Sequence, residues 1–488
     1  MEYQTLPAVP VLVIGGGLAG MYAALAVRRA GQPVTVVSKG KVGNSGNSAV
    51  AMSVHRFAPE APGLREDYRR RFTASAAGVA DPEIGAFYVQ NGARAVRAVK
   101  EELHAPLELR CLPEGGKDWP YLACCQPKLG IHLTRYLGAL LRRDPGVELQ
   151  EGETAFDLVK APDGAVAGVL TEKGGAIFYR PAAAVVLAAG GAGRVYARTS
   201  NTLDITGDGY AMARRAGLPL RDMEFFQFYP YRIFRPQVAD IFPDLFEHGA
   251  VFRNEKGERF MERYPMKELE NRNVLARAMY GQGRVFLDLT DCDMAYLERE
   301  CPRIFAMYRN FPGEPMELTP VAHFSMGGVP LRTDCATEMP GLFACGEVTG
   351  GLHGANRLAG SALTECALFG PIAGKSAAAF AAGASAPAAD AAALSALLGE
   401  LPEQGTEDLL PLRERLRRRM WEDASVVRSA AALPGLLAEL GEMEEALRRA
   451  RPEKLRSWLE LRSLLCTSQA IVQSAMSRKE SIGAHYIQ

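Results

Sequence analysis

Short apolar runs that end in glycines recur along the chain, and the first lies near the N-terminus. Residues 11–14 are all apolar and are followed directly by Gly15-Gly16-Gly17-Leu18-Ala19-Gly20. Residues 21–29 are rich in Ala and Leu and predict a helix, and residues 33–38 predict the next strand. A strand, a glycine-rich turn, a helix and a second strand in this order are the pattern of a βαβ unit that binds a dinucleotide.

Each glycine of this turn has a physical role in such a unit. Gly15 permits the tight turn, Gly17 lets a pyrophosphate approach the backbone, and Gly20 lets the helix pack closely on the strand. The free N–H groups at the start of the helix then face the phosphates. Ser38-Lys39 stands where an acidic residue often holds the ribose. A glycine-rich turn without a ligand is the alternative, but the position of the turn directly after the first strand favours a cofactor site.

The stretch that follows alternates between helical and strand patterns. Residues 40–49 are small, polar and glycine-rich, and form either a surface loop or a loop that wraps an extended ligand. Residues 181–191 predict a buried strand that ends in glycines, which suits a central parallel sheet. Helical patterns cover 65–103 and 131–143, strand patterns cover 148–150, 155–160, 165–171 and 176–179, and hairpin turns are predicted at 163–164 and 174–175.

The second half of the chain changes character twice. Residues 226–318 are richer in aromatic and charged side chains and predict a separate, inserted domain. Asp208 lies at the start of a predicted helix over 210–216, where it is either a helix cap or a ligand for cofactor hydroxyl groups. A further helix is predicted from Ser361 past Lys375, a linker over 378–393, and a small helical bundle from residue 392 onward.

Composition narrows the class of protein. The chain has 488 residues, and Lys+Arg and Asp+Glu both total 56, so its net charge gives no reason to expect nucleic acid or an anionic membrane as a partner. No apolar run reaches the roughly 20 residues that cross a bilayer, and no signal peptide is predicted. The nine cysteines form no CxxCH and no repeated CxxC, and the adjacent Cys124-Cys125 cannot alone hold an iron–sulfur cluster. We therefore expect a cytoplasmic protein with reduced thiols and no metal site.

Several blocks of the chain follow one another in the order found in a known flavoprotein family. They are Ala189–Gly193, Thr206–Met212, Asp222–Pro230, Gly257–Met261, His323–Gly328, His353–Leu358 and Arg478–His485. On these blocks, the protein resembles flavoproteins of the fumarate reductase, succinate dehydrogenase and L-aspartate oxidase type along nearly its whole length.

The resemblance implies an α/β fold with a Rossmann-like FAD-binding domain built on a parallel sheet. It also implies an inserted α+β capping domain and a C-terminal helical bundle. The expected divisions are 1–225 and 319–380 for the FAD-binding domain, 226–318 for the capping domain and 390–488 for the helical domain.

The family implies FAD rather than NAD as the cofactor. In respiratory members a histidine bonds covalently to the flavin, and Asn47 stands at the matching position here, so we predict non-covalent FAD. The helix that begins at Ser361 would direct its positive end at the flavin N1–C2=O edge. The expected cofactor contacts are Gly15, Gly16, Gly17, Leu18, Ala19, Gly20, Ser38, Lys39, Asn47, Ser48, Ala49, Ala51, Gly190, Asp208, Glu347, Ser361, Ala362 and Leu363.

The same resemblance assigns a proton donor. Arg272 matches the family's catalytic arginine in the inserted domain. Because a guanidinium has a pKa above about 12 in water, it can act as an acid only when buried and relayed, and Glu258 or Glu268 is expected to pass protons to it. Asn273 stands where the family usually has Asp. From the sequence pattern alone, Arg272 would instead be a surface salt-bridge residue.

Four further residues are expected to bind the substrate. His323 and Arg357 match the family's carboxylate-binding residues, and Arg357 can offer two parallel hydrogen bonds to a carboxylate. Gln227 belongs to the block that holds the sharpest departure, because Tyr229 stands where dicarboxylate enzymes place His. Tyr donates one hydrogen bond but is neutral at pH 7. We therefore expect a carboxylate-bearing substrate that is not simply fumarate, with a bulkier or uncharged far end.

Three functions follow as alternatives. The first is an FAD-dependent reductase of an activated C=C bond. The second is L-aspartate oxidase, favoured by Glu114-Gly115-Gly116 and by the missing flavin-linking histidine, and opposed by Lys117, Tyr229 and Asn273. The third is a flavoprotein component of a multi-subunit electron-transfer complex. Because the chain carries no haem or cluster motif, electrons are expected to pass to or from a partner protein, a quinone, free flavin or oxygen.

Overall fold

The sheet at the centre of the molecule has parallel strands in its middle and antiparallel strands at one edge. The computed structural model describes residues 2–51, 54–58, 60, 62–114, 117–124, 130–241 and 243–488. The strand order is β7-β3-β2-β10-β9-β8, with β1 and β17 also paired to β10. The parallel members are β1 (Gln4–Thr5), β2 (Val9–Ile14), β3 (Val34–Ser38), β7 (Val147–Glu151), β10 (Ala176–Leu187) and β17 (Leu342–Ala344), and the antiparallel ones are β8 (Thr154–Lys160) and β9 (Val166–Lys173).

Both faces of this sheet are covered, and β2 shows how its sequence allows that. Val11 and Val13 belong to the apolar core under α1 (Leu18–Arg29) and α10 (Ser361–Ala381), whereas Leu12 and Ile14 belong to the core on the opposite face. Alternate residues of a strand point to opposite faces, so a strand buried on both sides must be apolar throughout. The parallel core predicted for the N-terminal part is confirmed.

Three local predictions need correction. Residues 176–191, predicted as two strands, form the single strand β10, which ends at Leu187 before the glycines. The stretch 40–49, predicted as a loop, contains the start of the short helix α2 (Gly46–Val50). The predicted linker 378–393 is shorter, because α10 continues to Ala381 and α11 (Ala391–Gly399) begins early.

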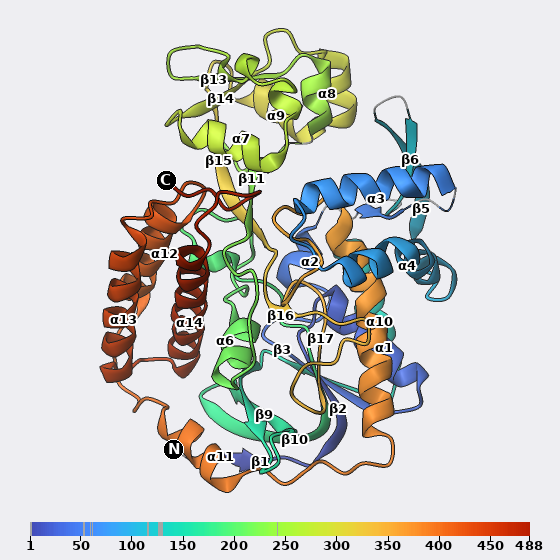
Figure 1. Cartoon of the computed structure of the whole chain (residues 1–488), viewed down its shortest axis with the longest axis vertical. Coiled ribbons are helices and arrows are strands. Elements are labelled where there is room, and N and C mark those ends of the chain that lie inside the picture. Colours follow the sequence, from blue (N-terminus) through green and yellow to red (C-terminus); the bar gives the residue numbers. More distant parts are fainter. Residues whose placement is uncertain are drawn as a thin grey trace.

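Helices cover both faces of the central sheet (Figure 1). On the side of α1 and α10 lie α4 (Pro82–Glu101) and α5 (Gly130–Arg143), and on the other side lies α6 (Asp208–Arg215) against the C-terminal helices. The remaining elements of this part are β4 (Val54–Arg56), α3 (Pro62–Ala76), β5 (Leu107–Glu114), β6 (Lys117–Cys124), η1 (Gly193–Val195), β16 (Val329–Pro330), β18 (Thr349–Gly350), α12 (Leu410–Ala424), α13 (Leu433–Arg449) and α14 (Leu455–Ser477).

A second sheet stands above the first in Figure 1 and has its own apolar core. Two long antiparallel strands, β11 (Phe226–Arg235) and β15 (Met316–Ser325), connect it to the rest of the molecule. Its strand order is β12-β11-β15-β14-β13. Its other elements are β12 (Ala239–Asp240), η2 (Pro243–His248), β13 (Val251–Asn254), η3 (Phe260–Arg263), η4 (Lys267–Leu269), α7 (Arg272–Tyr280), β14 (Val285–Asp288), α8 (Met294–Glu300) and α9 (Pro302–Asn310).

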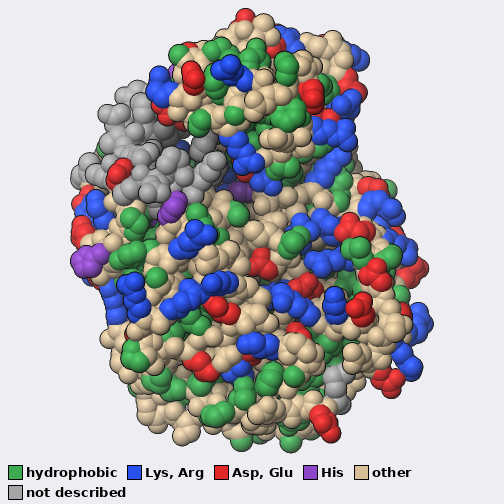
Figure 2. Space-filling view, turned by 180° about the vertical axis from the view of Figure 1, so that it is seen from behind, with side chains coloured by type: hydrophobic (Ala, Val, Ile, Leu, Met, Phe, Trp, Pro, Cys, Tyr) green, Lys and Arg blue, Asp and Glu red, His purple; other side chains and the backbone are tan. Residues whose placement is uncertain are grey.

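Charged side chains are prominent on the rear face of the molecule. Figure 2 shows Lys and Arg side chains across the middle of this face, with Asp and Glu side chains among them. The chain holds equal totals of basic and acidic residues, 56 of each. Among the described residues, no helix has both the length and the hydropathy that a membrane span requires.

Candidate active site

The glycines of the first turn occupy the carboxyl ends of the central parallel strands. A Cβ at Gly15 would lie 2.1 Å from the Ala188 carbonyl oxygen, and one at Gly20 would lie 2.0 Å from the Gly15 oxygen, so both positions require the missing side chain. At Gly17 a Cβ would meet only Ser48 Oγ, at 3.3 Å. This backbone is thus open on one side, at the N-terminus of α1, as a bound pyrophosphate needs.

Helix α2 brings other predicted cofactor residues to the same place. The Leu18 N–H donates to Ser48 Oγ over 3.1 Å, and the Thr202 N–H donates to Asn47 Oδ1 over 3.2 Å. A Cβ at Gly16 would lie 2.6 Å from Ser38 Oγ. Ala49 and Ala51 belong to the same short segment. These contacts gather residues of the first turn, β3 and α2 around one end of the sheet.

A second helix terminus faces this region. The N-cap of α10 is Gly360, with φ of +81°, and no described side chain caps the helix. The Ser361 N–H donates to the Leu358 carbonyl over 3.3 Å, which leaves the N–H groups of Ala362 and Leu363 for an acceptor. Glu347 is half-buried nearby and accepts a hydrogen bond from the Ser325 N–H over 3.0 Å. Burial raises the pKa of Glu347 to about 7. The residues present therefore fit a flavin with a negatively polarised edge.

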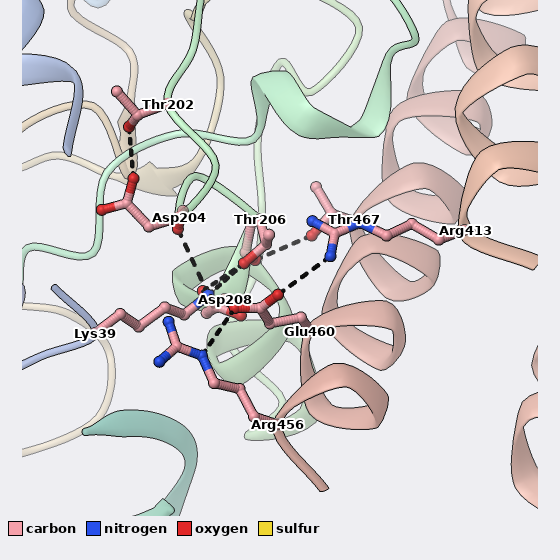
Figure 3. A network of polar contacts seen from close by, with 10 residues as sticks. Lys39, Thr202, Asp204, Thr206, Asp208, Arg413, Arg456, Glu460 and Thr467 are labelled. Carbon is pink, nitrogen blue, oxygen red and sulfur yellow. Dashed lines mark hydrogen bonds and ion pairs between the residues drawn. The ribbon is translucent and has the colours of Figure 1, made fainter. Parts of the chain in front are cut away.

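Two predicted cofactor residues lie in a different setting. The Lys39 Nζ lies 2.6 Å from Asp208 Oδ2 and 3.4 Å from Glu460 Oε1 of α14, and it also bonds Thr206 (Figure 3). Gly207, not Asp208, is the N-cap of α6, so the interpretation of Asp208 as a cap is wrong. Lys39 and Asp208 join the cofactor domain to the C-terminal helices through a buried charge network. Their contact with FAD stays a prediction, as does that of Gly190.

One amide oxygen joins the two arginines predicted to bind the substrate. Gln227 Oε1 accepts from Arg357 Nη2 over 2.9 Å and from Arg272 Nη1 over 3.2 Å. Its Nε2 donates to Asn356 Oδ1 and to the Arg357 carbonyl. The amide is therefore fully used, and its orientation is fixed. Arg357 Nε is buried without a hydrogen-bond partner among the described residues.

The two guanidinium groups carry unbalanced positive charge. Burial, followed by the repulsion of Arg272, lowers the pKa of Arg357 to about 9, and burial lowers the pKa of Arg272 as well. The Arg272 guanidinium stacks over the Tyr229 ring at 5.1 Å and that of Arg357 over Phe324 at 4.5 Å. An anion bound between them would offset the repulsion and satisfy the unpaired Nε.

His323 lies beside these groups in its uncharged form. Burial lowers its pKa well below the ordinary value, and the nearby Arg357 and Arg272 lower it further. Its Nδ1 is 2.8 Å from Ser200 Oγ, and its ring stacks on Tyr229 with centroids 5.0 Å apart. His323 can therefore hydrogen-bond to a substrate but adds no positive charge. No motif in the sequence marked Ser200, whereas Asn356 lay inside a block already quoted.

Tyr229 does not supply the hydrogen bond expected of it. Its hydroxyl donates to the Ile241 carbonyl over 2.8 Å, inside the upper sheet, and burial raises its pKa. The aromatic ring, and not the hydroxyl, faces Arg272 and His323. At this position, where the family has a histidine, the structure places an apolar surface.

The structure does not bring the two carboxylates predicted as a proton relay into contact with Arg272. Glu258 is exposed and its carboxylate accepts from Asn254 Nδ2 over 2.8 Å. Glu268 is buried but forms two hydrogen bonds with Arg259, of 3.0 and 2.9 Å. Within the described ranges, neither carboxylate bonds Arg272. The segment Glu114–Gly116, whose pattern favoured an aspartate oxidase, includes Gly115 and Gly116, which lie outside the described residues, as does Cys125.

Comparison with known proteins agrees with the geometry. An FAD binding domain family matches residues 10–363, and the C-terminal domain of fumarate reductase flavoproteins matches residues 413–488. The chain is 31% identical to a fumarate reductase (CoM/CoB) subunit of Methanothermobacter marburgensis, over 98% of this chain and 93% of that protein. It is 32% identical to L-aspartate oxidase of Caulobacter vibrioides, over 97% and 92% respectively.

Solved structures show the same fold. Quinol fumarate reductase FrdA of E. coli superposes with a TM-score of 0.87 at 26% identity, covering 99% of this chain and 92% of that chain. Sdh1 of Mycobacterium smegmatis also gives a TM-score of 0.87 at 26% identity, covering 99% of this chain and 89% of that chain. The fold, the glycine-rich turn that fits FAD and these likenesses together show that the chain belongs to the family of FAD-dependent oxidoreductases that includes fumarate reductase flavoproteins and L-aspartate oxidases.

Proposed function

We propose that this protein reduces a C=C bond conjugated to a carboxylate, as fumarate reductases do, on a substrate other than fumarate. The observation that carries the proposal is the pair of guanidinium groups of the half-buried Arg272 and the buried Arg357, both held by Gln227 Oε1. Among the described residues no carboxylate is hydrogen-bonded to either group. Two fixed, unpaired cations in a buried site are suited to bind an acid group of a ligand.

The residues of the chain divide the work in this reaction. FAD bound here, once reduced by two electrons from an electron-donor partner, would supply the hydride. Arg357 binds the carboxylate of the substrate, and its unpaired Nε adds a hydrogen-bond donor on the buried side. Arg272 holds a proton at a guanidinium nitrogen and delivers it to the second carbon, which is easier because burial has lowered its pKa. Gln227 keeps both guanidinium groups in a fixed relative orientation.

The wall next to this clamp supports a substrate with an uncharged far end. Tyr229 presents its ring there, since its hydroxyl is bonded to Ile241, and His323 is neutral. A second carboxylate at this wall would meet an aromatic surface and at most one neutral donor. Because an unpaired charge is costly to bury, fumarate should bind more weakly than an enoic acid with an apolar far end.

The test is an anaerobic half-reaction. Photoreduced enzyme is mixed in a stopped-flow instrument with fumarate, crotonate, cinnamate and other enoic acids, and reoxidation of the flavin is followed by absorbance. We expect reoxidation by enoic monocarboxylates with a lower half-saturating concentration than for fumarate. Saturated acids of the same size serve as controls. If no enoic acid reoxidises the flavin faster than its saturated control, the proposal is refuted.

L-aspartate oxidase is the second candidate, and the relative from C. vibrioides favours it. The same instrument decides between the two. Oxidised enzyme is mixed anaerobically with L-aspartate or succinate, and bleaching of the flavin by L-aspartate would support the oxidase and refute the reductase.

The relative from M. marburgensis is named as one subunit of its enzyme, which favours a complex in which a partner supplies electrons. The half-reaction does not depend on such a partner, because the flavin is reduced artificially before the enoic acid is added. Reoxidation of the flavin by the acid would then report on the site of this chain alone.

A further inference from the structure

The C-terminal tail touches both halves of the candidate active site. Residues 482–485 form a tight turn, with hydrogen bonds of 2.8 and 3.0 Å between the backbones of Ile482 and His485. The Ala484 N–H donates to the Ala355 carbonyl over 2.8 Å. Ala355 is fully buried and precedes Arg357 by two residues in the same loop. The tail therefore lies directly against the loop that carries one of the two arginines.

On its other side the same turn holds the helix that carries Arg272. The Gly483 carbonyl oxygen accepts two hydrogen bonds from α7, from Asn273 Nδ2 and from Arg277 Nη1, each 2.9 Å long. The Arg277 guanidinium also stacks over the Tyr486 ring at 5.1 Å. Asn273 directly follows Arg272 in the chain, so this contact fixes the first turn of α7, from which the Arg272 side chain projects.

The turn itself is rigidly held. Gly483 has a φ of +56°, and a Cβ there would lie 2.3 Å from the Ala355 oxygen, so only glycine fits. His485 is fully buried: its Nε2 faces the Arg478 carbonyl at 3.0 Å and its Nδ1 faces Arg428 Nη1 at 2.5 Å, which indicates a neutral ring protonated on Nε2. A carbonyl on such a rigid turn is a fixed reference point for α7.

From these contacts we infer that Asn273 is a positioning residue, which clasps α7 to the Gly483 carbonyl and so sets the Arg272 guanidinium against Arg357. The inference rests on the proposed function for its catalytic consequence. Asn suits this role because its amide donates, whereas the Asp usual in the family could not donate to a carbonyl when ionised. The Asn273 Oδ1 is buried without a partner among the described residues, beside a small cavity lined also by Gln227 and Arg277.

The test compares Asn273→Asp, Asn273→Ala and Asn273→Gln with the matched control Asn271→Asp. Asn271 is the N-cap residue of α7, directly before Arg272; it is exposed, and its side chain forms no capping bond in the described chain. Two readouts are taken on the FAD-loaded enzyme: hydrogen–deuterium exchange of residues 272–280, with α9 as internal reference, and kcat and KM with the best enoic acid. The control introduces the same charge without touching the tail.

We expect Asn273→Asp and Asn273→Ala to speed exchange in α7 by about tenfold and to lower kcat by roughly 10- to 100-fold, with KM changed less than threefold. KM is spared because Arg357 keeps its own anchor. Asn273→Gln, which retains the amide donor, should lose less than Asn273→Ala, and the control should match wild type. Unchanged exchange in α7 overturns the clasp, and faster exchange with unchanged kcat overturns the positioning role.

The two proposals fail in distinguishable ways. If no enoic acid oxidises the flavin of the wild-type enzyme, the proposed function fails, whereas the clasp is still read from hydrogen exchange. In that case the positioning of Arg272 is read from a crystal structure of Asn273→Ala, in which the hydrogen bond from Arg272 Nη1 to Gln227 Oε1 should be lost. Retention of that hydrogen bond together with faster exchange in Asn273→Ala would then overturn the positioning role.

Discussion

Replacement of Gln227 by Glu tests whether the two arginines bind the acid group of a substrate. The variant keeps the shape of the side chain and the two hydrogen bonds that it accepts from Arg272 and Arg357, of 3.2 and 2.9 Å, but places a negative charge between them. It also loses the two bonds that the Gln227 Nε2 donates to Asn356 Oδ1 and to the Arg357 carbonyl. A substrate carboxylate on the far edge of the same guanidinium groups would lie about 6 Å away. At an effective dielectric constant of about 20, two like charges at that distance repel by roughly 3 kcal/mol.

This repulsion has a measurable consequence. Since 1.4 kcal/mol is a factor of ten, the half-saturating concentration of the acid should rise by roughly 100-fold. It is measured by stopped-flow reoxidation of photoreduced enzyme over a concentration series. Gln282→Glu is the control, because Gln282 also lies in the inserted region and accepts a hydrogen bond, from Asn254, without contact to either arginine. A half-saturating concentration within twofold of wild type would show that the acid binds elsewhere.

Three further predictions follow from the same site and its surroundings. Arg272→Gln should lower turnover by roughly 10²- to 10⁴-fold, which is the usual contribution of a general acid, while the variant keeps the visible flavin spectrum. More than a tenth of the wild-type kcat in this variant would show that Arg272 is not the general acid. Acid precipitation should release the FAD into the supernatant, because Asn47 has no nucleophilic imidazole, and colour left in the pellet would contradict this. Burial and the neighbouring Arg428 lower the pKa of His485 to about 4, from an ordinary value near 6.5. Between these two pH values the unfolded state binds more protons than the folded state, so the free energy of unfolding must fall as the pH falls through this window. Urea unfolding at pH 7.5 and pH 5.5 should show a loss of about 1.4 kcal/mol from this histidine, which His485→Gln should remove, and an unchanged difference between the two pH values in the variant would exclude it as the cause.

Elements that depend on contacts between residues close in the chain could be predicted from the sequence. The turn over Gly15–Gly20 could be predicted because each glycine answers a contact within one βαβ unit, and β2 because a strand buried on both faces is apolar at every position. The order of the family blocks then assigned Gln227 and Arg357 to the site. These predictions depend only on residue type and spacing, both of which can be read directly from the sequence.

The contacts between side chains far apart in the chain could not be predicted and are known from the fold. Gln227 and Tyr229 lie on the same face of β11. The Gln227 amide nevertheless bridges two arginines, whereas the Tyr229 hydroxyl donates to the Ile241 carbonyl. The two residues differ in this way because segments distant in the sequence supply the neighbours of each. Lys39 meets Glu460, and Asn273 meets Gly483, across more than 200 residues of chain. In the sequence, Glu258 and Glu268 look equally suited to relay protons to Arg272. The residue type gives their charge, but the burial of each carboxylate and its hydrogen-bond partners depend on the fold.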